Sequence, residues 1–170
     1  MFYMSLESIP ISRIMNPDVK TDTEDQSIMS ASKIMHDNKI GCVIIIGLEI
    51  QKPVGIITER DVVRILGKLD PSLLRIPLSD LMTKPLMTIN EVSSVKDAMQ
   101  FMNTNNIRRL VAINKDQHMV GIITLKDIFK AINSSPQMFT EFYGRNFPAE
   151  FKNMYQRFSE YKFDGLKPYV

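Results

Sequence analysis

The sequence predicts an α+β protein built from two tandem copies of one strand-helix-strand-strand-helix unit. A Gly-Ile-Ile-Thr run at residues 55–58 returns at residues 121–124, and an aspartate follows each run three residues later, Asp61 and Asp127. The two halves align at an offset of 67 residues, which falls to 66 after a one-residue length change in the first hairpin. Composition changes after Asn133, where ten of the fourteen aromatic residues lie, and this predicts a separate C-terminal extension.

Within each copy the apolar residues first show helical spacing and then form a continuous run. Spacing of three or four residues predicts one amphipathic helix in each copy, and the continuous run predicts a buried strand. A polar stretch then predicts a hairpin turn, and the Gly-Ile-Ile-Thr run predicts the returning strand. The positions concerned are Ile28, Ala31, Met35, Val95, Ala98, Met99 and Met102 for the helices, 41–46 and 110–113 for the strands, and 47–53 and 114–119 for the hairpins.

The Thr–Asp pair that ends each run is typical of a helix N-terminus. A threonine hydroxyl can accept from the first backbone amides, and an aspartate in the first turn suits the positive end of the helix dipole. The glycine in the strand is not explained in this way, because glycine weakens a strand and often marks close approach by a ligand or another backbone segment. An open helix N-terminus also attracts anions. Thr58, Asp61, Thr124 and Asp127 therefore have both a structural and a ligand-binding interpretation.

The composition predicts an ordinary soluble globular protein of 170 residues, 44% hydrophobic and 24% charged. A formal net charge of +2 gives little reason to expect a nucleic-acid partner. Cys42 is the single cysteine and the two histidines are isolated, so neither a disulfide nor a metal site is predicted. The first residues contain no basic region or long apolar run, and we expect no signal peptide, no membrane span and a cytoplasmic location.

The repeated Gly-Ile-Ile-Thr-x-x-Asp run and the Ile-Arg-Arg-Leu sequence at 107–110 resemble a pair of cystathionine-beta-synthase (CBS) domains, a Bateman module. The resemblance covers about residues 9–133. It implies two repeats packed around a pseudo-twofold axis, and a regulatory rather than catalytic protein that senses AMP, ADP or ATP in clefts between the repeats. The predicted divisions are an N-terminal segment 1–8, repeat 1 at 9–67, a linker 68–75, repeat 2 at 76–133 and a C-terminal helical extension 134–170.

The resemblance also implies which residues bind the ligand. In similar proteins the threonine lies near ribose and phosphate, and the aspartate accepts from the ribose hydroxyls, as a carboxylate can. One predicted site contains Thr124, Asp127, Lys126, Asp18, Val19, Lys20, Gly41, Cys42, Arg108 and Arg109. The other contains Thr58, Asp61, Arg60, Pro85, Leu86 and Met87. The two arginines favour phosphate at the Asp127 site, whereas Arg60 and Lys126 could equally be solvated surface charges.

The C-terminal extension is predicted to form two helices. Pro136 opens the first and Gly144 ends it, while Pro148 opens the second, which runs to about Tyr161. The second helix could pack on its own module or a symmetry mate, or it could be a docking surface for a regulated partner. Its apolar stripe consists of Phe151, Met154, Tyr155, Phe158 and Tyr161.

We also expect a homodimer formed through the helix faces that follow Asp61 and Asp127, with Val63, Leu66, Phe129 and Ile132 as candidate contacts. Three other functions are alternatives to the nucleotide sensor. An S-adenosylmethionine-binding CBS module fits the same resemblance. An enzyme is the second alternative, but the sequence contains no Cys-His, Ser-His or Gly-rich phosphate-loop arrangement. A nucleic-acid module is the third, and it would use Arg108, Arg109 and the aromatic tail.

Overall fold

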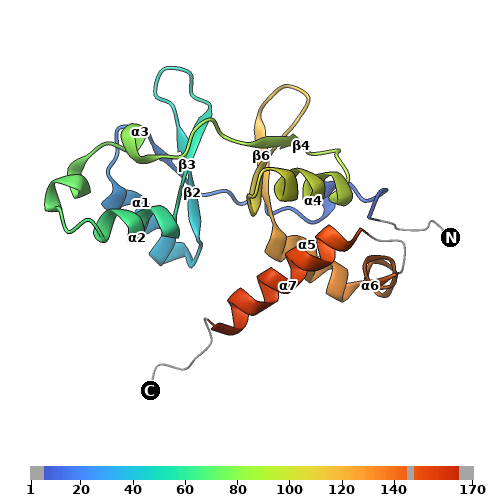
Figure 1. The fold of residues 1–170 in the computed structure, drawn as a ribbon. Coiled ribbons are helices and arrows are strands. Elements are labelled where there is room, and N and C mark those ends of the chain that lie inside the picture. The colour runs from blue at the N-terminus through green and yellow to red at the C-terminus, as the bar shows by residue number, and fades with distance from the viewer. Residues whose placement is uncertain (1–5, 145–147, 165–170) are drawn as a thin grey trace. The chain divides into compact units, whose positions relative to one another are not determined.

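The computed structural model describes residues 6–144 and 148–164, with side chains described as far as residue 156 (Figure 1). It divides into two compact units. Residues 18–87 form one of them, here called the first-repeat unit. The second-repeat unit combines the chain up to Pro17 with the chain from Thr88 onward. Both contain the predicted order of strand, helix, strand, strand and helix, and the α+β prediction is confirmed.

The first-repeat unit contains a three-stranded sheet with the order β1-β2-β3. β1 and β2 are parallel and α1 connects them, whereas β2 and β3 form an antiparallel hairpin and α2 follows β3 directly. α1 and α2 contact each other and the sheet, and their apolar side chains form the core with those of the strands (Figure 1). The elements are β1 (Thr21–Thr23), α1 (Ile28–Asn38), β2 (Cys42–Ile46), β3 (Pro53–Thr58), α2 (Glu59–Leu66), η2 (Pro71–Arg75) and α3 (Leu78–Leu81).

The second-repeat unit has the same sheet, β4-β5-β6, with the same parallel and antiparallel pairings. It adds two helices after α5, as the sequence predicts. Its elements are η1 (Ile11–Arg13), β4 (Thr88–Asn90), α4 (Val95–Thr104), β5 (Arg109–Ile113), β6 (Met119–Thr124), α5 (Leu125–Ser134), α6 (Pro136–Tyr143) and α7 (Ala149–Asp164).

The compact units differ from the sequence repeats because the repeats exchange their leading segments. Asn16, from the start of repeat 1, exchanges two backbone hydrogen bonds of 2.9 Å with Ile122 on β6. Its counterpart Thr83, from the start of repeat 2, does the same with Ile56 on β3, at 2.9 and 3.1 Å. Each segment therefore satisfies backbone groups on the outer edge of a last strand, which would otherwise lie unpaired.

This exchange explains the glycine in each Gly-Ile-Ile-Thr run. A Cβ atom on Gly121 would lie 3.0 Å from the carbonyl oxygen of Asn16 and 2.7 Å from Met15 Sδ. A Cβ atom on Gly55 would lie 3.1 Å from the carbonyl oxygen of Thr83. Of the two explanations open from the sequence, the structure shows the close approach of another backbone segment at both glycines.

The C-terminal helices belong to the core of the second-repeat unit. Phe142 of α6 and Phe151 and Met154 of α7 are buried in one cluster with side chains of α4 and α5. The ring of Tyr155 lies edge-on to Phe129 of α5, with 4.8 Å between the centroids. The interpretation that the stripe packs on its own module is confirmed for these residues. Phe158 and Tyr161 lie outside the side chains that the structure describes.

The N-terminal segment is part of the same core. Leu6 is fully buried in the cluster, and its backbone amide donates to Glu141 Oε2 on α6 at 2.8 Å. The ammonium group of Lys96 on α4 pairs with the carboxylate of Glu7. The segment before repeat 1 and the extension after repeat 2 therefore stabilise one unit together.

This arrangement corrects two of the four expected dimer contacts. Phe129 and Ile132 are only 2% and 0% exposed, because α6 and α7 of the same chain contribute to the cluster that buries them. Their counterparts in repeat 1, Val63 and Leu66, are 68% and 54% exposed. The helix face that sequence alone assigns to a partner is thus already covered in the second-repeat unit.

Replacing Phe151 by alanine tests the structural role of α7. The expected loss in free energy of unfolding is about 3 to 5 kcal/mol, because a buried aromatic ring is removed and a cavity is left. Phe139→Ala is the matched control, since Phe139 of α6 is 46% exposed, and its loss should stay below about 1 kcal/mol. Urea unfolding followed by circular dichroism measures both, and equal stabilities of the two variants would contradict this packing.

Gly121→Ala tests the close approach of the exchanged segment. We expect a loss of about 1 to 3 kcal/mol, because the new methyl group overpacks against the Asn16 carbonyl. Gly41→Ala is the control, because a Cβ there would meet only the movable side chain of Glu59, at 3.1 Å. The same unfolding experiment compares them, and a Gly121→Ala protein as stable as the control would show that the segment is not held against β6.

Candidate ligand-binding site

The two Thr–Asp pairs have nearly the same geometry, at the junction of a last strand and the following helix. Asp61 Oδ2 accepts from the Thr58 amide at 2.9 Å and from Thr58 Oγ1 at 2.7 Å. In the second repeat, Asp127 Oδ2 accepts from the Thr124 amide at 3.0 Å and from Thr124 Oγ1 at 2.6 Å. Each threonine is thus the N-cap of its helix, and each aspartate completes the capping box from position N3. The structural interpretation is confirmed, and it fixes the carboxylate by one oxygen atom.

The second carboxylate oxygen distinguishes the two repeats. Asp61 Oδ1 accepts from Arg64 Nη2 at 3.0 Å, one turn further along α2. Among the residues that the structure describes, none donates a hydrogen bond to Asp127 Oδ1. Arg64 was not identified from the sequence, although its spacing of three residues from Asp61 is that of a helical ion pair.

Different neighbours flank the two pairs. In the second-repeat unit Arg109 is the register partner of Thr124, and the Leu125 amide donates to the Arg108 carbonyl at 3.0 Å. Arg109 therefore begins β5 beside Thr124, and Arg108 directly precedes the strand. This places two cationic residues at the start of α5, where the helix dipole also favours an anion.

The corresponding places in the first-repeat unit are occupied by Gly41 and Cys42. Cys42 is the register partner of Thr58, and the Glu59 amide donates to the Gly41 carbonyl at 3.3 Å. Cys42 is half-buried rather than a full core residue. The side chain of Glu59 lies beside Gly41, which adds a negative charge that the second repeat lacks, because Leu125 stands at that position.

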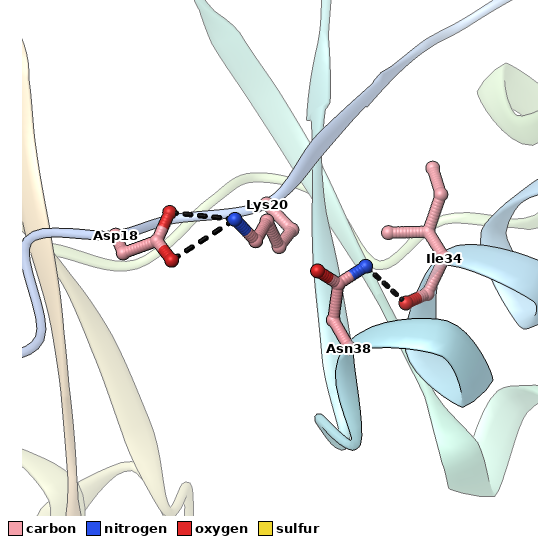
Figure 2. Close-up of polar contacts among 4 residues, drawn as sticks. All are labelled: Asp18, Lys20, Ile34 and Asn38. Atoms are coloured by element: carbon pink, nitrogen blue, oxygen red, sulfur yellow. Dashed lines mark hydrogen bonds and ion pairs between the residues drawn. The ribbon is translucent and has the colours of Figure 1, made fainter.

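The remaining predicted site residues lie before the first strands and on the helix surfaces. Figure 2 shows Lys20 Nζ bonded to both carboxylate oxygens of Asp18, at 2.7 and 2.9 Å. It also shows Asn38 Nδ2 donating to the Ile34 carbonyl at 2.8 Å, a bond that closes the end of α1 before Gly41. Val19 precedes β1, and Pro85, Leu86 and Met87 precede β4. Arg60 and Lys126 are exposed in the first turns of α2 and α5.

Which of these residues share a ligand stays a prediction.

No group of three or more histidine, cysteine, aspartate or glutamate side chains is placed to hold a metal ion within the part of the chain that the structure describes. In that same part, no helix combines the length and the apolar character needed to cross a membrane.

The sequence model of the CBS domain matches residues 11–68 and 78–134. These two matches cover more than half of the chain, and the chain therefore belongs to the CBS domain family. The prediction of a CBS domain pair from the repeated Gly-Ile-Ile-Thr-x-x-Asp run is confirmed.

Individual relatives agree with this assignment. The uncharacterized protein MK0525 of Methanopyrus kandleri is 29% identical over 125 residues, which are 74% of this chain and 63% of that protein. The match thus spans less than two thirds of that relative's length. The CBS domain pair of protein MJ0100, solved with 5′-methylthioadenosine and S-adenosyl-L-methionine, is 26% identical with a TM-score of 0.66, covering 74% of this chain and 97% of the other.

A second similar structure extends the likeness of fold. The CBS domain protein PAE2072 from Pyrobaculum aerophilum, solved in complex with AMP, is 22% identical with a TM-score of 0.65. The likeness covers 75% of this chain and all of the other. It shows that the two proteins share the fold of a CBS domain pair.

Proposed function

We propose that the chain is a regulatory module that binds an adenosine-containing ligand through the Thr124–Asp127 pair. The observation that supports this most directly is the state of the Asp127 carboxylate. One oxygen is fixed by the Thr124 amide and hydroxyl, and the other receives no hydrogen bond from the described residues. A carboxylate held in this way can accept from a ribose hydroxyl without first losing another partner.

The related CBS pair of MJ0100 supports the class of ligand, since it was solved with two adenosine derivatives. Within that class, Arg108 and Arg109 favour a ligand with phosphate groups, because guanidinium groups bind phosphate with charge-assisted hydrogen bonds. A sulfonium ligand such as S-adenosylmethionine would bring a positive charge toward the same arginines. AMP, ADP and ATP are therefore the preferred candidates.

The module acts by binding rather than by catalysis in this proposal, and the nucleotide is a regulatory ligand rather than a catalytic cofactor. The alternative in which the aromatic stripe docks a regulated partner has lost support, because Phe151 and Met154 are buried in the module itself. The homodimer remains part of the proposal, with the exposed Val63 and Leu66 as its contacts.

AMP titrated into the protein by isothermal titration calorimetry tests the site. Asp127→Ala should weaken binding by about ten- to hundredfold, because hydrogen bonds to a charged group are lost. Asp61→Ala should weaken it much less, and it is the matched control because it removes the same helix cap at a comparable cost in stability. Both variants are first checked for folding by thermal unfolding, with and without AMP.

Equal losses of affinity in the two variants, or no loss in either, would contradict the preference for Asp127. Titration of S-adenosylmethionine under the same conditions separates the two ligand classes. Tighter binding of S-adenosylmethionine than of AMP would identify the alternative ligand.

A further inference from the structure

The two repeats present the same helix cap but different residues one turn later. The offset of 66 residues that aligns Asp61 with Asp127 also aligns Arg64 with Lys130. Arg64 donates to Asp61 Oδ1, whereas Lys130 forms no ion pair among the described residues. Because Asp61 Oδ2 is already used by Thr58, both oxygens of Asp61 have partners within the protein.

The burial of this ion pair is uneven. The Asp61 side chain is 12% exposed and the Arg64 side chain 60% exposed. A mostly exposed guanidinium group is therefore bonded to Oδ1 of a nearly buried carboxylate. A ligand hydroxyl that needs the Oδ1 acceptor must compete with the guanidinium group for it.

We propose that Arg64 is a specificity-determining residue that blocks the carboxylate of the first repeat and so directs an adenosine ligand to the second repeat. This inference rests on the proposed function, since it assumes that ribose hydroxyls bind the aspartate of the Thr–Asp pair. It goes beyond the effect of Arg108 and Arg109, because it concerns the acceptor for the sugar and not the charge near the phosphate.

The expected size of the effect follows from the exposure of Arg64. Ion pairs with an exposed partner are weak, and their removal changes an equilibrium by roughly two- to fivefold. Release of Arg64 should therefore tighten ligand binding at Asp61 by about that factor. The change should appear with a ligand that has ribose hydroxyls but no phosphate, because phosphate attraction to Arg64 would act in the opposite direction.

The test uses the full chain with Asp127→Ala, so that binding at Asp61 is measured by itself. 5′-Methylthioadenosine is the probe, because it has both ribose hydroxyls and no phosphate. Adding Arg64→Ala or Arg64→Lys should each lower the dissociation constant roughly two- to fivefold. Lys33→Ala is the control, because it removes an exposed ion pair with Asp37 in the same unit and should leave the affinity unchanged.

An unchanged or weaker affinity after both Arg64 substitutions would overturn the inference, and so would the absence of detectable binding with and without Arg64. An equal gain with Lys33→Ala would also overturn it, by showing a general effect of charge. Failure of the unsubstituted protein to bind 5′-methylthioadenosine and AMP is a different result. It would reject the proposed function, and this inference would fall with it.

Discussion

The structure depends on the hydrogen bonds between the leading segment of each repeat and the last strand of the other. Asn16 and Thr83 hold these segments against β6 and β3, and each segment covers a strand edge that would otherwise attract other chains. Glycine suits positions 55 and 121 because a Cβ at either position would crowd a backbone carbonyl of the paired segment. Neither unit is therefore complete from the sequence of one repeat alone.

The same duplicated plan has been made asymmetric at two places. On the helix surface, α6 and α7 bury Phe129 and Ile132, while Val63 and Leu66 remain exposed. At the helix N-termini, Arg64 donates a hydrogen bond to Asp61 Oδ1, whereas none of the residues that the structure describes donates to Asp127 Oδ1. In the second repeat, the apolar face of α5 is therefore buried, and Asp127 Oδ1 is left as a hydrogen-bond acceptor. A covered helix face and an accessible acceptor on the same unit suit a ligand site more than an assembly surface.

The sequence predicts the repeat, the order of elements, the capping aspartates and the two C-terminal helices, because each depends on local spacing. It does not predict that the Asn16 backbone packs against Gly121, since similarity between the copies does not reveal which copy a segment contacts. Phe129 and Ile132 were misassigned because an apolar helix face has the same pattern whether a partner or the same chain covers it. Arg64 was missed because Arg64 and Lys130 both read as surface charge until the geometry of the carboxylate is known.

A crystal structure determined with AMP bound is the most direct test of the account. It predicts a ribose hydroxyl within about 2.6 to 3.2 Å of Asp127 Oδ1, while Thr124 still holds the other oxygen, and the phosphate near Arg108 and Arg109. AMP bound only at Asp61, or at a position without contact to either aspartate, would contradict the central claim that the second repeat's Thr–Asp pair is the ligand site.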